Sequence, residues 1–179
     1  MIFIGLDPGL QGGMALINES EGATRIMPTI AYRKKRVLDH STLRSILSGF
    51  DPDETYAVLE QQHPMPKQGV SSMFSIGYGF GALKQCLIDF SIPHEVVRAT
   101  VWQKEFGISS RKGNTKVQAL QICQDLFPNV NLLATEKSKK PHAGIVDALL
   151  IAEFSRRRYA GIASQSDRAT AKTEKRLRC

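Results

Sequence analysis

Short apolar segments separated by turn-forming residues dominate the first part of the chain. Residues Ile2 to Leu6 are almost all apolar, which predicts a buried central strand that ends at Asp7. A turn is expected at Asp7-Pro8-Gly9, because these residue types favour reversals of the backbone. Further strands are expected at about Gly13 to Ile17, Thr24 to Ile30, Tyr56 to Leu59 and His94 to Arg98. The first three of the strands should form an antiparallel meander.

Apolar residues at helical spacing predict helices between and after these strands. A short helix should span about Ser41 to Ser48, and a longer one, capped by Ser71 or Ser72, should run to about Phe90. The later segments are a helical stretch with Trp102, a helix capped by Asn114 that ends near Phe127, and a last helix from about Gly144 to Tyr159. The order β-β-β-α-β-α-β-α-α is typical of the ribonuclease H-like fold. We therefore expect an α/β protein with a mixed five-stranded sheet and helices on both faces.

Length and composition fit one globular domain with a polar end. The chain has 179 residues, of which 42% are hydrophobic and 23% charged. A domain is expected over residues 1–160, and a basic, disordered tail over residues 161–179. The sequence contains no apolar run of ~18 residues, so no membrane segment is expected. The three cysteines form neither a zinc pattern nor a disulfide framework, which favours a reducing intracellular compartment, in a cell, an organelle or a virus-infected host.

The positive charge of the chain points to an acidic partner. The net charge is +7 and the pI is near 9.5, which is typical of proteins that bind nucleic acid. The alternative is a basic protein without such a partner. The cations occur in several separate clusters, as expected of a surface that follows a phosphate backbone: Arg33 to Arg36, Arg111-Lys112 with Lys116, Lys137 with Lys139-Lys140, Arg156 to Arg158, and the end from Gly161 onward.

Three acidic residues stand among apolar neighbours at the ends of predicted elements. Asp7 ends the first strand, Glu60 ends the fourth, and Asp147 lies beside the apolar stripe of the last helix. Clustered carboxylates repel one another unless a cation joins them, and oxygen ligands suit Mg²⁺ or Mn²⁺. Two such ions can activate a water molecule and stabilise the leaving 3′-oxygen of a phosphodiester. Each acid taken singly has an ordinary alternative: a turn residue, an exposed strand end, or a helix acid favoured by the dipole.

Several motifs taken together resemble the RuvC-type resolvases. The first strand pair carries Ile4-Gly5-Leu6-Asp7-Pro8-Gly9 and Gly12-Gly13-Met14-Ala15, and Asp147 is followed by Ala148-Leu149-Leu150-Ile151-Ala152. One subgroup of these resolvases includes the chloroplast junction resolvase and its phage and bacterial relatives. This chain resembles that subgroup at Leu59-Glu60, Pro64-Met65-Pro66-Lys67-Gln68-Gly69, Ser72 and Gly77-Tyr78-Gly79. The resemblance covers about residues 2 to 160. It implies a homodimeric Holliday junction resolvase, a crossover junction endodeoxyribonuclease, with four acidic or histidine ligands and two Mg²⁺ ions that Mn²⁺ can replace.

The fourth ligand departs from the pattern of these resolvases. Relatives commonly carry another acid shortly before the last one, but Ala143 and Gly144 have no ligand atoms in their side chains. His142 is the nearest candidate, because a neutral imidazole can bind metal or carry a proton. Its alternative is a loop histidine near the start of the helix. Glu153 is a weaker candidate, since six positions beyond Asp147 it points to another face of the helix.

A second group of residues is expected to contact DNA or a second subunit. The resemblance places the region after Glu60 at the centre of the junction, where Phe74 could stack on an unpaired base. The glycines at positions 77, 79 and 81 indicate close backbone approach, to DNA, to another subunit or to the sheet, and Leu83 with Leu87 should provide an apolar stripe for a dimer. Trp102 fits the core better than a contact surface. The residues expected to bind DNA are Lys67, Ser72, Met73, Phe74, Lys112 and Lys116.

Three other functions remain open at this point. The first is a nuclease of the same fold for other branched or flapped DNA. The second is a DNA-binding module without catalysis, against which the set Asp7, Glu60 and Asp147 argues. The third is an ATP-binding protein of the actin and sugar-kinase type, but such proteins need two domains and a second glycine-rich phosphate loop. We therefore expect branched DNA as the partner and no nucleotide cofactor.

Overall fold

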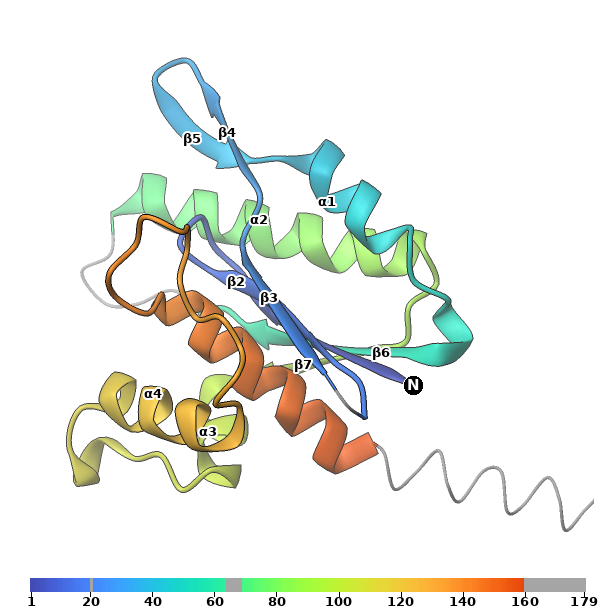
Figure 1. Ribbon diagram of the computed structural model, residues 1–179. Coiled ribbons are helices and arrows are strands. Elements are labelled where there is room, and N and C mark those ends of the chain that lie inside the picture. Colours follow the sequence, from blue (N-terminus) through green and yellow to red (C-terminus); the bar gives the residue numbers. More distant parts are fainter. Residues whose placement is uncertain (20, 64–68, 160–179) are drawn as a thin grey trace, which may run out of the picture.

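The centre of the protein is a mixed sheet of five strands (Figure 1). The structure is a computed structural model that describes residues 1–19, 21–63 and 69–159. The strand order is β3-β2-β1-β6-β7, in which β2 and β3 run antiparallel and β6 and β7 run parallel to β1. The predicted mixed five-stranded sheet is thus confirmed. The strands are β1 (Ile2–Asp7), β2 (Gly13–Ile17), β3 (Gly22–Ile26), β6 (Thr55–Gln61) and β7 (His94–Arg98).

A separate hairpin replaces part of the predicted third strand. The prediction of one strand from Thr24 to Ile30 is wrong, because β3 ends at Ile26 and the chain then enters β4 (Thr29–Tyr32) and β5 (Lys35–Leu38). Met27 ends the pairing with β2: its side chain is fully buried and its N–H donates to the Gly12 carbonyl at 3.0 Å. Pro28 has no N–H with which to continue a ladder. The two strands of the hairpin pair only with each other in the described sheets.

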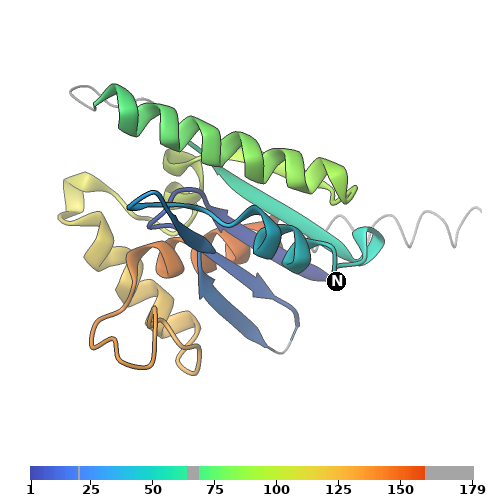
Figure 2. The same ribbon diagram turned by 90° about the horizontal axis from the view of Figure 1, so that it is seen from above.

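Helices cover both faces of the sheet, as predicted (Figures 1 and 2). On one face lie α1 (His40–Leu47) and α2 (Val70–Asp89). On the other face lie α3 (Ala99–Glu105), α4 (Thr115–Leu126) and a helix over residues 143–159, here called the C-terminal helix. Two short 3-10 helices, η1 (Pro52–Glu54) and η2 (Ser110–Lys112), complete the described elements. No helix among the described residues is long and apolar enough to cross a membrane.

The predicted helix starts are partly correct. Asn114 caps α4, since its side-chain oxygen accepts the Lys116 N–H at 2.9 Å. The prediction that Ser71 or Ser72 caps α2 is wrong: the capping residue is Gly69, and it makes no side-chain hydrogen bond. The basic tail predicted over residues 161–179 lies outside the described residues.

The apolar side of α2 faces the sheet. Leu83 and Leu87 are fully buried in the cluster that joins α1 and α2 to β1 and β6. The expectation that these two leucines form a stripe for a dimer is therefore wrong, because the monomer already covers them. The burial of Leu83 and Leu87 orients α2 so that the side bearing Gly77 and Gly81 is exposed.

Candidate active site

Strand alternation places Asp7 and Glu60 on the same face of the sheet. In β1, Ile4 and Leu6 point toward α1 and α2, so Gly5 and Asp7 point the opposite way. In β6, Ala57 and Leu59 point toward α2, whereas Glu60 shares its face with Val58, which belongs to the cluster of the C-terminal helix. The two strands are parallel neighbours, and Leu6 is paired with Leu59 in the register. The two carboxylates therefore lie at the same edge of the sheet.

Close backbone contacts bring the C-terminal helix, and with it Asp147, to this edge. A methyl group added at Gly5 would lie 2.0 Å from the Ala148 carbonyl oxygen, and one at Gly13 would lie 2.4 Å from that of Gly144. Conversely, a methyl group at Gly144 would lie 2.4 Å from the carbonyl oxygen of Gln11. No side chain fits at these glycines without movement of the helix. These close contacts hold the C-terminal helix against β1 and β2, and so place Asp147 beside Asp7 and Glu60.

Burial disfavours the charged forms of all three carboxylates, and neighbouring carboxylates add to this effect at Asp7 and Asp147. Burial, followed by the charges of Glu60 and Asp147, raises the pKa of Asp7 well above its usual range. Burial raises the pKa of Glu60 as well. Burial and then the charge of Glu60 raise the pKa of Asp147 to about 6. Each of the three side chains is half-buried, so the site is a partly desolvated concentration of negative charge.

Trp102 holds the Glu60 carboxylate, a role that the sequence reasoning did not find. Its indole Nε1 donates to Glu60 Oε2 at 2.7 Å, and the Gln62 amide donates to Oε1 at 3.3 Å. Trp102 is otherwise buried in the core, as predicted. A buried indole N–H requires an acceptor, but the sequence does not indicate which residue supplies it.

Lys116 lies beside the acids rather than on a remote basic surface. Its charge lowers the pKa of both Asp7 and Asp147, against the larger upward effects of burial and the neighbouring carboxylates. The side chain extends from the first turn of α4, which Asn114 caps. Lys116 thus partly neutralises the charge of this carboxylate cluster.

The donor set suits a hard divalent cation. Carboxylate oxygens are the preferred ligands of Mg²⁺ and Mn²⁺, and a bound cation would offset both the burial of the three acids and the repulsion felt by Asp7 and Asp147. Among the described residues, no three His, Cys, Asp or Glu side chains are already gathered at the spacing of a metal site. Glu60 Oε2 accepts the Trp102 indole N–H in this structure. The residues therefore fit the ion by chemistry and by shared location.

His142 lies at the start of the C-terminal helix. Its carbonyl oxygen accepts the N–H groups of Ile145 and Val146 at 3.0 and 3.1 Å. Its ring atom Nδ1 is buried and has no hydrogen-bond partner among the described residues. Burial and then the charge of Arg36 lower the pKa of His142, which keeps the ring neutral and able to donate a lone pair to a metal. The positive charge that acts on the His142 ring therefore comes from Arg36 in the β4–β5 hairpin.

Glu153 is committed to ion pairs elsewhere on the helix. Arg156 Nε donates to Glu153 Oε2 at 2.7 Å, and Arg157 Nε donates to Oε1 at 2.8 Å. These bonds lower the pKa of Glu153 in opposition to burial, the largest single effect. The carboxylate is satisfied by two guanidinium groups, which leaves the alternative of Glu153 as a metal ligand without structural support.

Of the residues predicted to bind DNA, Ser72 lines the same cavity as Asp7, and the charge of Lys116 acts on Asp7 and Asp147. A cavity of about 350 Å³ is lined by Asp7, the loop from Pro8 to Gly12, Gln62 and, from α2, Ser72, Ser75 and Ile76. Phe74 is 75% exposed on the same helix, which excludes the core as its place, and Met73 is half-buried. Lys112 donates to the Gly107 carbonyl at 3.2 Å. Lys67 lies outside the described residues.

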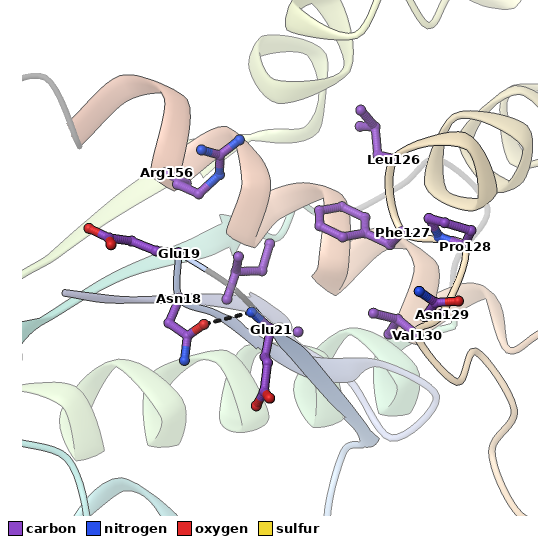
Figure 3. A pocket seen from close by; sticks show the side chains of 11 residues that line it. Asn18, Glu19, Glu21, Leu126, Phe127, Pro128, Asn129, Val130 and Arg156 are labelled. Carbon is purple, nitrogen blue, oxygen red and sulfur yellow. Dashed lines mark hydrogen bonds between the residues drawn. The ribbon is translucent and has the colours of Figure 1, made fainter.

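A larger cavity lies away from the carboxylates (Figure 3). It measures about 580 Å³ and lies between the β2–β3 turn, the end of α4 and Arg156. Its lining residue Ile17 is at the opposite end of β2 from Gly13, so the cavity belongs to the far end of the sheet. Glu19 and Glu21 line it and would repel a phosphate. The cavity is therefore a poor site for nucleic acid.

Known structures share the fold of this chain. No family model and no curated protein matches the sequence. The RuvC of T. thermophilus in complex with a Holliday junction substrate matches with a TM-score of 0.56 and 15% identity, over 90% of this chain and 96% of that chain. A second Thermus thermophilus RuvC structure matches with a TM-score of 0.54 and 15% identity, over 91% and 97%. The predicted ribonuclease H-like, RuvC-like fold is confirmed; the chloroplast and phage-like subgroup stays a prediction.

Proposed function

We propose that this chain is a metal-dependent DNA endonuclease that resolves Holliday junctions by paired nicks. The observation that carries the proposal is the convergence of Asp7, Glu60 and Asp147 from two strands and a helix, half-buried and mutually repelling. Clustered carboxylates oppose one another's ionisation, and a bound divalent cation would relieve this penalty. The likeness in fold to a RuvC solved with a Holliday junction substrate supports the choice of DNA.

Each residue of the site has a distinct part in the proposed hydrolysis. Asp7, Glu60 and Asp147 would hold Mg²⁺, or Mn²⁺ in its place, with His142 as the candidate fourth ligand. Two bound ions supply an activated water and stabilisation of the leaving 3′-oxygen. Trp102 keeps Glu60 in one orientation, which removes a rotational freedom from the ligand. Lys116 would neutralise the phosphate beside Asp7 and Asp147.

The contacts with DNA would come from the elements around the cavity at Asp7. Ser72, Met73 and Phe74 stand at the start of α2, and the exposed ring of Phe74 would stack on an unpaired base at the junction centre. Lys112 and Lys116 would bind phosphates on the other side of the acids. This arrangement would set the DNA across the carboxylates.

The working unit would be a symmetric homodimer, because a junction needs two nicks and one chain supplies one site. The exposed side of α2 is the candidate interface. Methyl groups added at Gly77 or Gly81 would meet nothing within 4 Å, so packing within this chain does not require glycine there. Ile88, seven residues after Gly81 on the same side, is 52% exposed. Sedimentation should therefore give about twice the chain mass of 19.8 kDa.

A panel of labelled DNA substrates tests the proposed specificity. With Mg²⁺, the protein should cut a synthetic four-way junction in preference to a three-way junction, a flap and a duplex of the same arm sequences. Faster cleavage of the flap or the three-way junction would assign the same carboxylates to the alternative function, a nuclease for other branched DNA. Tight binding without cleavage in Mg²⁺ and in Mn²⁺ would favour a junction-binding module.

A further inference from the structure

The β4–β5 hairpin is an exposed two-stranded ribbon outside the main sheet. Residues 30–36 are all exposed, including Ile30 and the ring of Tyr32. Tyr32 is paired with Lys35 across the turn, so the tip consists of Arg33 and Lys34. Figure 1 shows the ribbon rising away from the sheet above the first half of α2. Because the ribbon buries little apolar surface, it adds little to the stability of the core. Its exposed apolar and charged residues therefore point to a role in binding.

The turn of this ribbon contains residues that its backbone does not favour. Arg33 and Lys34 both have positive φ values, 45° and 63°. A two-residue hairpin turn of this kind prefers Asn-Gly, since those residues adopt the left-handed region at low cost. The chain instead keeps two cations at the tip, in a conformation that is unfavourable for both. Stability alone therefore does not explain the residues at the tip.

The ribbon is uniformly basic. Arg33, Lys34, Lys35 and Arg36 are consecutive, and no acidic residue occurs between Glu21 and Asp39. The Arg33 guanidinium lies 5.4 Å from the centre of the Tyr32 ring, which holds the cation against a flat surface. Arg36 donates from Nη2 and Nε to Thr29 Oγ1 at 2.6 and 3.1 Å and so joins the two strands at their base. The result is a row of exposed cations with no carboxylate on the ribbon itself to neutralise them.

A continuous path connects the ribbon to the carboxylates. A groove of about 400 Å³ lies between the ribbon and α2, and its walls include Tyr32, Arg36, Phe74 and Tyr78. Tyr78 is held in place by a 2.9 Å hydrogen bond between its hydroxyl and His40 Nε2. Gly9, Leu10 and Ser75 line this groove and also the cavity that contains Asp7. A nucleic acid strand in the cavity at Asp7 would therefore leave it along the ribbon.

We propose that the β4–β5 ribbon binds the phosphate backbone of the DNA arm adjacent to the cleaved bond, with Arg33, Lys34 and Lys35 as the contacts. The inference rests on the proposed function, because it assumes that DNA occupies the cavity at Asp7. Charge complementarity selects the occupant: a row of exposed cations beside a groove matches a polyanion. The width of a two-stranded ribbon also suits the major groove of a duplex arm.

The test replaces the tip by the residues that its backbone prefers. The double variant Arg33→Asn with Lys34→Gly removes two cations while it improves the turn, so a loss of binding cannot come from a weakened hairpin. The matched control is Arg25→Gln with Lys104→Gln, which removes two exposed cations from β3 and α3. A second variant, Lys35→Gln, removes one cation from a strand position. Fluorescence anisotropy with a labelled four-way junction, in EDTA so that nothing is cut, gives the affinity of each protein over a range of salt concentrations.

Two lost phosphate contacts should lower the slope of log K against log salt by about 1.8. At ~0.1 M salt this corresponds to about 60-fold weaker binding, provided that affinities converge near 1 M. Lys35→Gln should lower the slope by about half as much, and the control should keep the slope of the wild type. An unchanged slope in the ribbon variant, or an equal loss in the control, would overturn the inference while the proposed function stands. Failure of the wild type to bind any DNA would instead overturn the proposed function.

Discussion

Asp147→Asn should stabilise the metal-free protein. Burial and the charge of Glu60 raise the pKa of Asp147 from the ordinary 3.8 to about 6. The folded protein therefore binds this proton more tightly than the unfolded chain does, and at neutral pH, above both values, ionisation of Asp147 opposes folding. One pKa unit corresponds to about 1.4 kcal/mol, which gives about 3 kcal/mol as an upper value. Since Asp147 is only half-buried, solvent screening reduces this to about 2 kcal/mol.

Thermal unfolding in EDTA measures this effect. At pH 7.5 the melting temperature of Asp147→Asn should exceed that of the wild type by about 4–8 °C for a domain of this size. The difference should shrink as the pH falls from about 6 to about 4, because the wild-type carboxyl then takes up its proton in the folded state first and in the unfolded chain later. Addition of Mg²⁺ should reverse the order, since only the wild type retains all three carboxylate ligands.

Asp125→Asn is the control for the replacement of an aspartate by an asparagine at a position outside the carboxylate cluster. Asp125 is exposed on α4, where its carboxylate accepts the Gln121 amide at 2.9 Å, so its replacement should alter the melting temperature little and without the pH dependence expected at Asp147. The reasoning would be refuted if Asp147→Asn were less stable than the wild type in EDTA at neutral pH, or if its advantage were the same at pH 4 and pH 7.5.

Three further substitutions test the surroundings of the site. Trp102→Phe removes a hydrogen bond to a charged group, worth about 1.5–3 kcal/mol, and should lower kcat about 10- to 100-fold with an unchanged Kd for the junction; a normal kcat would show that Glu60 needs no such support. His142→Ala should lower the cleavage rate on the order of 10²-fold, and an unchanged rate across pH would remove His142 from the mechanism. Gly144→Ala should destabilise the fold by about 1–3 kcal/mol in urea titrations, whereas Gly49→Ala, whose methyl group would lie 3.5 Å from its nearest neighbour, should not; equal effects would argue against the close contact of the C-terminal helix.

The sheet and most helices could be predicted because their pattern is local. The apolar runs that end at Asp7 and Glu60, and the asparagine before α4, determine those elements within a few residues. The hairpin was not predicted because strand-forming residues stand on both sides of Pro28, and one strand was expected across it. The Met27 N–H still donates to the Gly12 carbonyl, but Pro28 has no N–H to continue the ladder, and the next strand pairs within the hairpin.

The positions of the acids were easier to predict than the residues that support them. Period-two alternation places Asp7 and Glu60 on the face opposite Leu6 and Leu59, the last buried apolar residues of their two strands. The roles of Trp102 and Lys116 depend on how α3 and α4 pack against the sheet, for which a single sequence has no local signal. The same limit explains the error at Leu83 and Leu87: an apolar stripe shows that a helix buries a face but does not say against what.

Cleavage of a synthetic four-way junction by the wild type and by Asp7→Asn, with the ends mapped at nucleotide resolution, tests the central claim most directly. With Mg²⁺ the wild type should produce paired nicks on opposed strands, and EDTA should prevent them. Asp7→Asn should bind the junction with an affinity close to that of the wild type and cut neither strand, because Asp7 holds metal while the cations hold phosphate. Cleavage by Asp7→Asn at the wild-type rate, or a wild type that binds the junction but cuts it with neither Mg²⁺ nor Mn²⁺, would contradict the account.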